Sequence, residues 1–166
     1  TVVMNNYLAG AMAAKHLLSL GHQRFACITG PTNISINRDR TRGFRETILA
    51  AGGILEDKNI FEGSFKFESG IRGADYLLDS RAEFTGLWVQ NDYMAIGAMN
   101  QFANRGVSIP GDVSIVGLDN IEHAWMIRPA LTTIAQPFQK MCACAVDIIV
   151  RMNLKERSEM SRVVLD

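Results

Sequence analysis

Short, nearly continuous apolar runs alternate along this chain with longer segments of helical periodicity. The runs occupy residues 25–29, 59–65, 86–90 and 113–117, and the helix-like segments between them occupy residues 40–51, 69–78 and 93–105. A strand that is apolar on both sides is expected in a parallel sheet whose two faces are covered by helices. Strands that alternate with helices at this spacing favour right-handed crossovers. The sequence therefore predicts an α/β fold, a doubly wound parallel sheet in a three-layer αβα arrangement.

The alternation of strand-like and helix-like segments ends after Asp119. Residues 120–137 contain two prolines and no helical periodicity, and they predict an irregular crossing with a short strand at 131–134. A helix is predicted over 138–152 and a last strand over 163–165. At the other end, residues 2–4 form a short apolar opening, and residues 8–20 predict a helix that ends at Gly21.

The charges of the chain balance. Its 166 residues include 17 Lys and Arg and 17 Asp and Glu, which gives a net charge of zero. A nucleic-acid-binding domain normally carries a basic excess or stripe. The cluster of Arg38, Arg40 and Arg42 is therefore expected to serve something smaller than DNA.

The three cysteines favour neither a disulfide framework nor a metal site. Cys27 lies in an apolar run and is predicted to be a buried thiol. Cys142 and Cys144 are two residues apart on a predicted helix, so they point to different faces. Reduced thiols fit a cytoplasmic protein, and no apolar stretch has the length of a membrane span. We expect no metal, no cofactor and no membrane insertion.

A ligand site is predicted where the strands end. In an open parallel sheet, ligands bind beyond the carboxyl ends of the strands, which selects the loops at 30–38, 63–67, 90–92 and 118–120. Their side chains include a forked donor, paired acceptors and an aromatic face, which suits a neutral, hydroxyl-rich ring. The candidates are Arg38, Phe65, Asn91, Asp92, Asp119 and Asn120.

Several of these residues also have a purely structural interpretation. Asp92 precedes a predicted helix, and we favour a capping role for it over ligand contact. Arg40 and Arg42 enter a helix and are expected to be structural or solvated, and Phe65 could belong to the core. Asp119 is the strongest candidate, because no helix pattern follows it that it could cap.

Common enzyme motifs do not occur in the sequence. It contains no G-x-S-x-G, G-x-x-x-x-G-K-[ST], G-x-G-x-x-G or H-E-x-x-H pattern. Asp92 and Asp119 could still take part in catalysis, but nothing sets up an acid–base pair with opposed environments. Binding without turnover is the preferred interpretation.

Six fragments carry a resemblance to a known family. "GHQRFACITGP", "RTRGF", "GSFKFESG", "VQNDYMAIGAM", "GVSIPGDVSIVGLDN" and "PALTTIAQP" occur in the order seen in LacI/GalR-family bacterial transcriptional repressors. The resemblance implies part of a hinged, two-lobed core that is similar to periplasmic sugar-binding proteins. Residues 1–130 would form its C-terminal lobe, and residues 131–166 would return to an N-terminal lobe. That lobe and a helix-turn-helix that binds operator DNA would precede Thr1.

The resemblance also implies roles for individual residues. Arg38 would be the effector-binding arginine and Phe65 the aromatic that stacks on the ligand ring. Asn91 or Asp92 would be the polar strand-end residue, Asp119 would hydrogen-bond the effector, and Gln136 would lie near the cleft where the chain crosses between lobes. Ile34 and Ile36 replace polar contacts of purine-binding members, so a sugar or a nucleoside is the expected effector.

The resemblance further implies a homodimer formed through this lobe. The segment 125–127 and the helix 95–102 would supply apolar surface for it, unless Trp125 is buried locally. The helix at 138–152 is expected to expose an apolar face or to pack on another copy. A transport-type periplasmic sugar-binding protein and an α/β enzyme acting on sugars remain as alternatives. A helix-turn-helix or a signal peptide before Thr1 would separate the first of these from a repressor.

Overall fold

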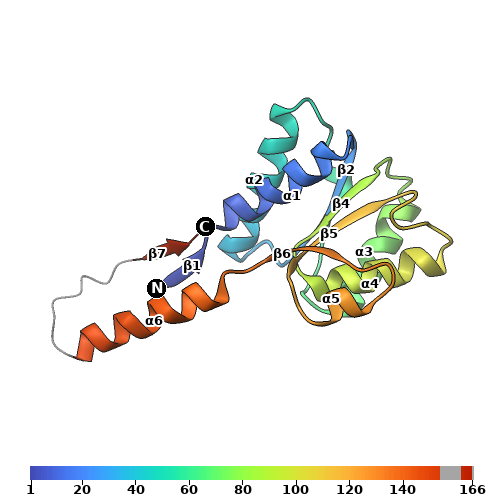
Figure 1. Ribbon diagram of the computed structural model, residues 1–166. Coiled ribbons are helices and arrows are strands. Elements are labelled where there is room, and N and C mark those ends of the chain that lie inside the picture. Colours follow the sequence, from blue (N-terminus) through green and yellow to red (C-terminus); the bar gives the residue numbers. More distant parts are fainter. Residues whose placement is uncertain (154–161, 166) are drawn as a thin grey trace. The chain divides into compact units, whose positions relative to one another are not determined.

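A computed structural model describes residues 1–153 and 162–165 of the chain (Figure 1). Five parallel strands form its main sheet in the order β3-β2-β4-β5-β6, with neighbours joined in parallel register. The strands are β2 (Phe25–Thr29), β3 (Ile60–Glu62), β4 (Gly86–Val89), β5 (Ser114–Asp119) and β6 (Thr132–Ala135). The chain runs outward from β2 to β3 and then returns across β2 to β4, so a topological switch point lies between β2 and β4.

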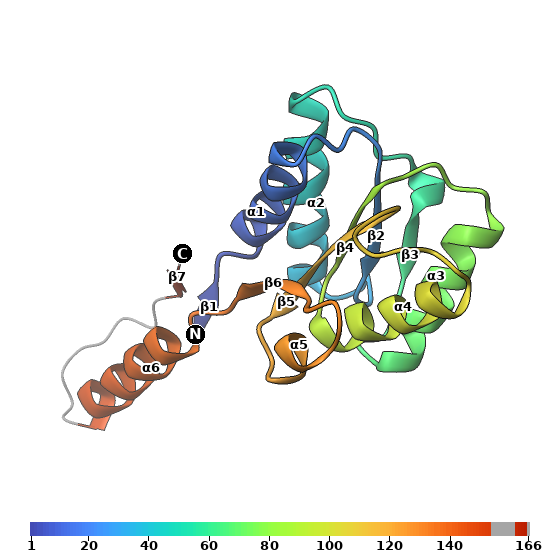
Figure 2. The ribbon, with the colours of Figure 1, turned by 45° about the vertical axis from the view of Figure 1, so that its right-hand side comes forward.

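Helices cover both faces of this sheet. One pair, α1 (Asn6–Ser19) and α2 (Ser35–Ala50), lies on one face, and the pair α3 (Phe67–Asp79) and α4 (Asp92–Asn104) lies on the other (Figure 2). Each interface contains its own apolar core, one around Phe44 and Trp88 and the other around Leu87 and Phe102. The predicted doubly wound α/β sheet in three layers is confirmed.

Several element boundaries differ from the prediction. Helix α2 begins at Ser35, five residues before the predicted start. The residue before it, Ile34, makes no side-chain capping bond, so no capping residue marks this start in the sequence. Strand β3 covers three residues of the predicted 59–65, since the loop leaves the ladder after the bond from the amide of Gly63 to the carbonyl of Thr29. The crossing segment contains a four-residue helix, α5 (His123–Met126), which is too short to show periodicity.

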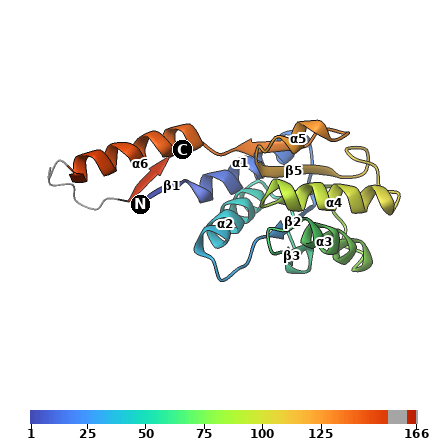
Figure 3. The same cartoon turned by 90° about the horizontal axis from the view of Figure 1, so that it is seen from below.

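The helices of each pair lie side by side (Figure 3), and glycines permit the close approach. A Cβ atom on Gly10 of α1 would fall 2.0 Å from the carbonyl oxygen of Arg40 in α2. One on Gly43 of α2 would fall 2.0 Å from the carbonyl oxygen of Tyr7 in α1. The two backbones therefore touch at two points, in a reciprocal manner.

The pair α3 and α4 repeats this arrangement. A Cβ atom on Gly70 of α3 would fall 2.0 Å from the carbonyl oxygen of Met94 in α4. One on Gly97 of α4 would fall 2.1 Å from the carbonyl oxygen of Phe67 in α3. Any side chain at these four positions would push the helices apart.

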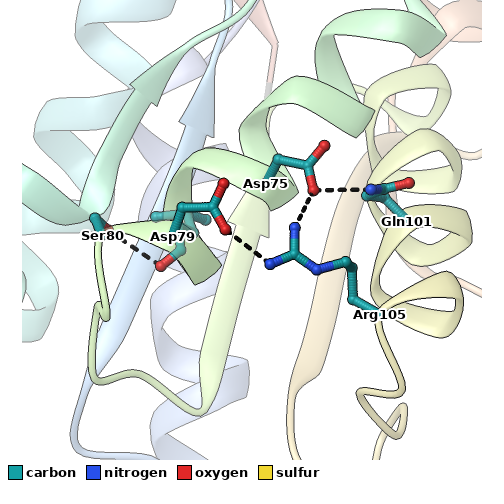
Figure 4. Close-up of polar contacts among 6 residues, drawn as sticks. Asp75, Asp79, Ser80, Gln101 and Arg105 are labelled. Atoms are coloured by element: carbon teal, nitrogen blue, oxygen red, sulfur yellow. Dashed lines mark hydrogen bonds and ion pairs between the residues drawn. The ribbon is translucent and has the colours of Figure 1, made fainter.

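An ion-pair cluster joins the far ends of α3 and α4 (Figure 4). Arg105 donates to Asp75 at 2.6 Å and to Asp79 at 2.7 Å, and Gln101 donates to Asp75 at 2.8 Å. The two carboxylates raise the pKa of Arg105, with Asp79 contributing most. Because α4 starts at the carboxyl edge of the sheet and runs back, this cluster lies at the opposite edge from the predicted ligand site. It stabilises the packing of the two helices.

The contacts divide the chain into two compact units, Asn6–Ala135 and Thr1–Asn5 with Gln136–Asp166. In the second unit, β1 (Val2–Met4) pairs in parallel with β7 (Val163–Leu165), and α6 (Phe138–Asn153) has no buried residue over its described length. Val146 and Ile149 of α6 are exposed, as the sequence predicted for this helix. The predicted division at residue 130 stays a prediction. Over residues 1–153 and 162–165, no helix is long and apolar enough to cross a membrane.

Candidate ligand-binding site

The four loops selected from the sequence gather at one edge of the sheet. They follow β2, β3, β4 and β5, which are parallel neighbours, so their carboxyl ends lie next to one another. The topological switch point between β2 and β4 lies within this group, and open α/β sheets bind ligands at such a point.

Gln90, which follows β4, is fully buried at the centre of the group. Its Oε1 accepts from the amide of Gly30 at 3.2 Å, and its Nε2 donates to Oγ1 of Thr41 at 2.8 Å and to the carbonyl of Asn37 at 3.4 Å. These bonds fix the ends of β2 and β4 to the first turns of α2. Sequence reasoning placed Gln90 in a loop and gave it no role. The available signal was a polar residue at the end of an apolar strand.

Arg40 is the arginine that reaches into this network. It is 5% exposed, its Nε donates to Oδ1 of Asn6 at 2.8 Å, and its Nη1 donates to the carbonyl of Gln90 at 3.1 Å. Burial lowers the pKa of Arg40, and the charge of Asp119 opposes that change. The structural role predicted for Arg40 agrees with these bonds. Its electrostatic link to Asp119 was not predicted.

Arg38 and Arg42 lie on other sides of α2. Arg38 is exposed, and its Nη1 donates to the carbonyl of Thr32 at 2.9 Å. Arg42 pairs with Asp39 at 3.3 Å, and its guanidinium carbon lies 5.4 Å from the ring centroid of Tyr7. Arg42 is therefore a surface residue, as predicted. The assignment of Arg38 to the ligand stays a prediction, and in this structure Arg38 supports the loop after β2.

Phe65 occupies the loop after β3 in a left-handed conformation, with φ of 65°. Its carbonyl accepts from Nδ2 of Asn91 at 2.9 Å. A Cβ atom on Gly30 would fall 2.4 Å from Cε1 and Cζ of Phe65, so the rim of the ring rests on this glycine. A bulky residue with positive φ is strained, and such strain is found at binding sites. The ring is half-buried, so part of it remains accessible.

The capping role predicted for Asp92 belongs to Asn91, and the ligand contacts predicted for the two residues stay predictions. Asn91, not Asp92, is the N-cap of α4, and its Oδ1 accepts from the amide of Met94 at 3.0 Å. Asp92 is fully buried, and its carboxylate accepts from the amide of Ile121 at 3.0 Å and from Oγ1 of Thr133 at 2.6 Å. The capping role given to Asp92 was wrong because its side chain turns away from α4 toward the ends of β5 and β6.

Asp119 ends β5 in an unusual backbone conformation. Its φ is 127° and that of Asn120 is 57°, although neither residue is a glycine. The amide of Asn120 donates to Oγ1 of Thr133 at 3.2 Å, which helps to hold the turn. Asp119 is half-buried, and its charge acts on Arg40.

Gln136 belongs to the other unit, where its carbonyl accepts from the amide of Phe138 at 2.8 Å. Its assignment to the ligand site stays a prediction. No group of three or more His, Cys, Asp and Glu side chains that could hold a metal ion occurs in the part of the chain that the structure describes. The arrangement offers hydrogen-bonding groups, the half-buried Asp119 and an aromatic ring.

The fold and the loop group together define a ligand-binding lobe of the periplasmic-binding-protein type. The family model for the periplasmic binding protein-like domain matches residues 14–166. The chain belongs to this family, in the form found in LacI-type transcriptional regulators.

Relatives and solved structures agree with this assignment. The HTH-type transcriptional regulator DegA of Bacillus subtilis is 38% identical over 99% of this chain and 48% of its own length. The HTH-type transcriptional repressor CytR of Escherichia coli is 36% identical over 82% of this chain and 40% of its own length. The chain thus spans about half the length of the curated relatives it matches.

Two solved structures show the same fold. The cellobiose complex of the transcriptional regulator CelR matches with a TM-score of 0.93 and 30% identity, over 99% of this chain and 50% of that one. The transcription regulator CcpA of Lactococcus lactis matches with a TM-score of 0.89 and 30% identity, over 99% of this chain and 60% of that one.

Proposed function

We propose that this chain is the effector-sensing part of a LacI-type transcriptional repressor that binds a sugar or a nucleoside at the carboxyl edge of the sheet. The single observation that carries the proposal is the half-buried carboxylate of Asp119, electrostatically linked to the buried Arg40, in the same loop group as the ring of Phe65. A carboxylate accepts from hydroxyl groups, and an aromatic face packs against ring carbons. The matched CelR structure contains cellobiose, which supports a sugar.

In this proposal the candidate residues divide into two groups. Phe65, Asn91 and Asp119 contact the ligand, together with Arg38 where the loop after β2 meets it. Asp92 holds the next loop in place and does not contact the ligand itself, because its carboxylate is buried and accepts a hydrogen bond from the backbone of that loop. The effector would then change the affinity for operator DNA of a domain that precedes this segment in the whole protein.

The substitution Asp119→Asn tests the proposal. It removes one charge from the site, and losing a charge-assisted hydrogen bond is expected to weaken ligand binding by about 1.5–3 kcal/mol. The control is Glu122→Gln, which makes the same change of charge at an exposed position three residues away. The measurement is an amide NMR titration with monosaccharides and nucleosides, in which resonances of Phe65, Asn91 and Asp119 should shift. Equal binding by wild type and Asp119→Asn would remove Asp119 from the site.

A transport-type periplasmic sugar-binding protein is the second candidate, because the family model itself describes a periplasmic binding protein-like domain. The relatives named above are transcriptional regulators, which favours a cytoplasmic repressor without turnover of its ligand. The sequence before Thr1 decides between the two. A helix-turn-helix supports the repressor, and a signal peptide would contradict it. Release of a chemically altered sugar, dependent on Asp119, would instead indicate an enzyme.

We further propose that two copies associate through the surface around α5. Trp125 is 61% exposed and Met126 is 49% exposed, so local burial of Trp125 was not the outcome. A hollow of about 340 Å³, lined by Ile96, Met99 and Ile127 among others, adjoins this segment. Large exposed apolar side chains beside a hollow are typical of interaction surfaces. Trp125→Glu should shift the sedimentation coefficient toward the monomer, whereas Leu49→Glu, at an exposed leucine on α2, should not.

A further inference from the structure

Asn37, in the first turns of α2, is held tightly at the edge of the ligand site. It is 1% exposed, and its Nδ2 donates to the carbonyl of Pro31 at 2.8 Å. Its own main-chain carbonyl accepts from Oγ1 of Thr41 at 2.8 Å and from Nε2 of Gln90 at 3.4 Å. The side-chain amide has one orientation in this setting, because the reverse orientation would place two carbonyl oxygens against each other.

The other atom of this amide, Oδ1, is buried and has no hydrogen-bond partner among the described residues. A buried acceptor without a donor is destabilising, and it is rare enough in folded proteins to require an explanation. The described residues contain two further side-chain atoms of this kind, in Asn59 and Trp88. Asn59 donates to the carbonyl of Phe25 at the start of β2, and Trp88 lies within β4, so neither belongs to the loop group.

Asn37 and Phe65 border the same point above Gly30. A Cβ atom on Gly30 would fall 2.6 Å from Nδ2 of Asn37 and 2.4 Å from the rim of the Phe65 ring. Gly30, Asn37 and Gln90 are buried, whereas Phe65 is half-buried. The buried amide of Asn37 and the half-buried ring of Phe65 therefore lie next to each other, at the end of β2 where the loop group begins.

We propose that Oδ1 of Asn37 accepts a hydrogen bond from a hydroxyl or N–H group of the bound effector, which makes Asn37 a specificity-determining residue at the inner end of the site. This inference rests on the function proposed above. It explains why a fixed amide presents an unused acceptor beside the aromatic ring. It also predicts a preference: an effector with a donor at this position binds, and an analogue that lacks the donor is rejected, because the buried oxygen then stays without a partner.

Two substitutions separate ligand contact from support of the loop. Asn37→Leu removes both the acceptor and the bond to Pro31, whereas Asn37→Asp keeps an acceptor oxygen, replaces the donor to Pro31 and adds a buried acidic group. The amide NMR spectrum of each variant is compared with that of wild type, so that only folded protein enters the comparison. The probes are D-glucose, D-ribose and adenosine, with the monodeoxy analogues of each one that binds. Affinities are measured by amide NMR titration and calorimetry, with Asp119→Asn as a parallel variant.

The expected result is a loss of roughly tenfold or more in affinity for Asn37→Leu and a smaller loss for Asn37→Asp, which keeps an acceptor oxygen. One deoxy analogue should bind wild type more weakly than its parent sugar, and Asn37→Leu should not distinguish the two, as in a double-mutant cycle.

Four results would overturn the inference. An equal loss in both Asn37 variants would show that Asn37 acts through Pro31, and unchanged affinity in both would show that it makes no contact. Binding that depends on Asp119 and not on Asn37 would refute this inference alone. If no probe shifted resonances of Asn91 or Asp119, the proposed function would fail, and the role of Asn37 would fail with it.

Discussion

The amide nitrogen of Gly30 lies 3.2 Å from Oε1 of Gln90, a residue sixty positions further along the chain. This bond joins the loop after β2 to the end of β4, across the topological switch point of the sheet. The same side chain also bonds to Thr41 in α2. Gln90 therefore holds three segments of the candidate site in one arrangement before any ligand binds.

Replacing Gln90 should destabilise the protein considerably. Gln90→Leu keeps the volume of the side chain but leaves the amide of Gly30 and the hydroxyl of Thr41 without their partner in a buried region. We expect a loss of about 3 kcal/mol in the free energy of unfolding, measured by urea denaturation. The control Gln101→Leu removes a single bond to Asp75 on the helix surface and should cost about 1 kcal/mol. Equal losses of stability in the two variants would show that the buried hydrogen bonds of Gln90 contribute no more than the surface bond of Gln101.

The three neighbouring arginines should respond differently to substitution. Arg40→Met removes the two buried hydrogen bonds to Oδ1 of Asn6 and to the carbonyl of Gln90, so we expect a loss of about 2 kcal/mol or more in the free energy of unfolding. Arg38→Met and Arg42→Met change exposed side chains and should stay within about 0.5 kcal/mol of wild type. Chemical denaturation of the three variants checks this order. A larger loss for Arg38→Met would contradict it.

The different positions of Arg38 and Arg40 depend on where the helix begins, which the sequence alone did not predict correctly. Arg38 and Arg40 are two residues apart in α2, so their side chains point about 200° apart and cannot both face the site. The sequence placed the start of the helix at Arg40, which left Arg38 in a loop and free to turn inward. Because α2 begins at Ser35, Arg38 is already part of the helix and lies on its exposed side.

Other features could be predicted because a single local pattern determines them. The strand at Phe25–Thr29 was predicted with its observed bounds, since every residue in it is apolar or small and is buried. The grouping of the four loops follows from parallel strands alone. The partners of Gln90 and Asp92, by contrast, lie about thirty to sixty residues away in sequence, and no local pattern records them.

The glycine beneath the Phe65 ring should tolerate no side chain. Gly30→Ala places a Cβ atom 2.4 Å from the ring and 2.6 Å from Nδ2 of Asn37, so the ring must move. We expect a loss of about 1–3 kcal/mol in stability, as for overpacking elsewhere. In the double variant Gly30→Ala with Phe65→Ala, part of this loss should be recovered. A strictly additive double variant, measured by thermal unfolding, would show that the ring and the glycine do not interact.

The contact between Glu62 and Thr32 should depend on pH. Hydrogen bonds from the hydroxyl of Thr32 at 2.6 Å and from its amide at 3.1 Å lower the pKa of Glu62. A carboxyl whose pKa is lower in the folded state stabilises that state above its unfolded pKa of about 4.3. The contribution is lost as the pH falls through the folded value. The amide resonance of Thr32 should therefore titrate at a lower pH than an unperturbed glutamate would cause, and this step should disappear in Glu62→Gln.

The thiols should differ in reactivity. Cys27 is fully buried in β2, and burial raises its pKa well above the usual range, so the reactive thiolate does not form near neutral pH. Cys142 on α6 is exposed. Iodoacetamide at pH 8 should therefore modify Cys142 in the native protein and reach Cys27 only after denaturation, as read by peptide mass spectrometry. Rapid native labelling of Cys27 would indicate that the sheet opens locally.

The reciprocal glycine contacts make each helix pair mechanically stiff. The backbones of α1 and α2, and those of α3 and α4, meet without side chains between them, so neither pair can slide or rotate without a collision. The two helical layers consequently leave little room for the helices to move when a ligand binds at the proposed site. Any rearrangement at the proposed site is therefore expected in the loops and side chains of that edge and not in the packing of the helices.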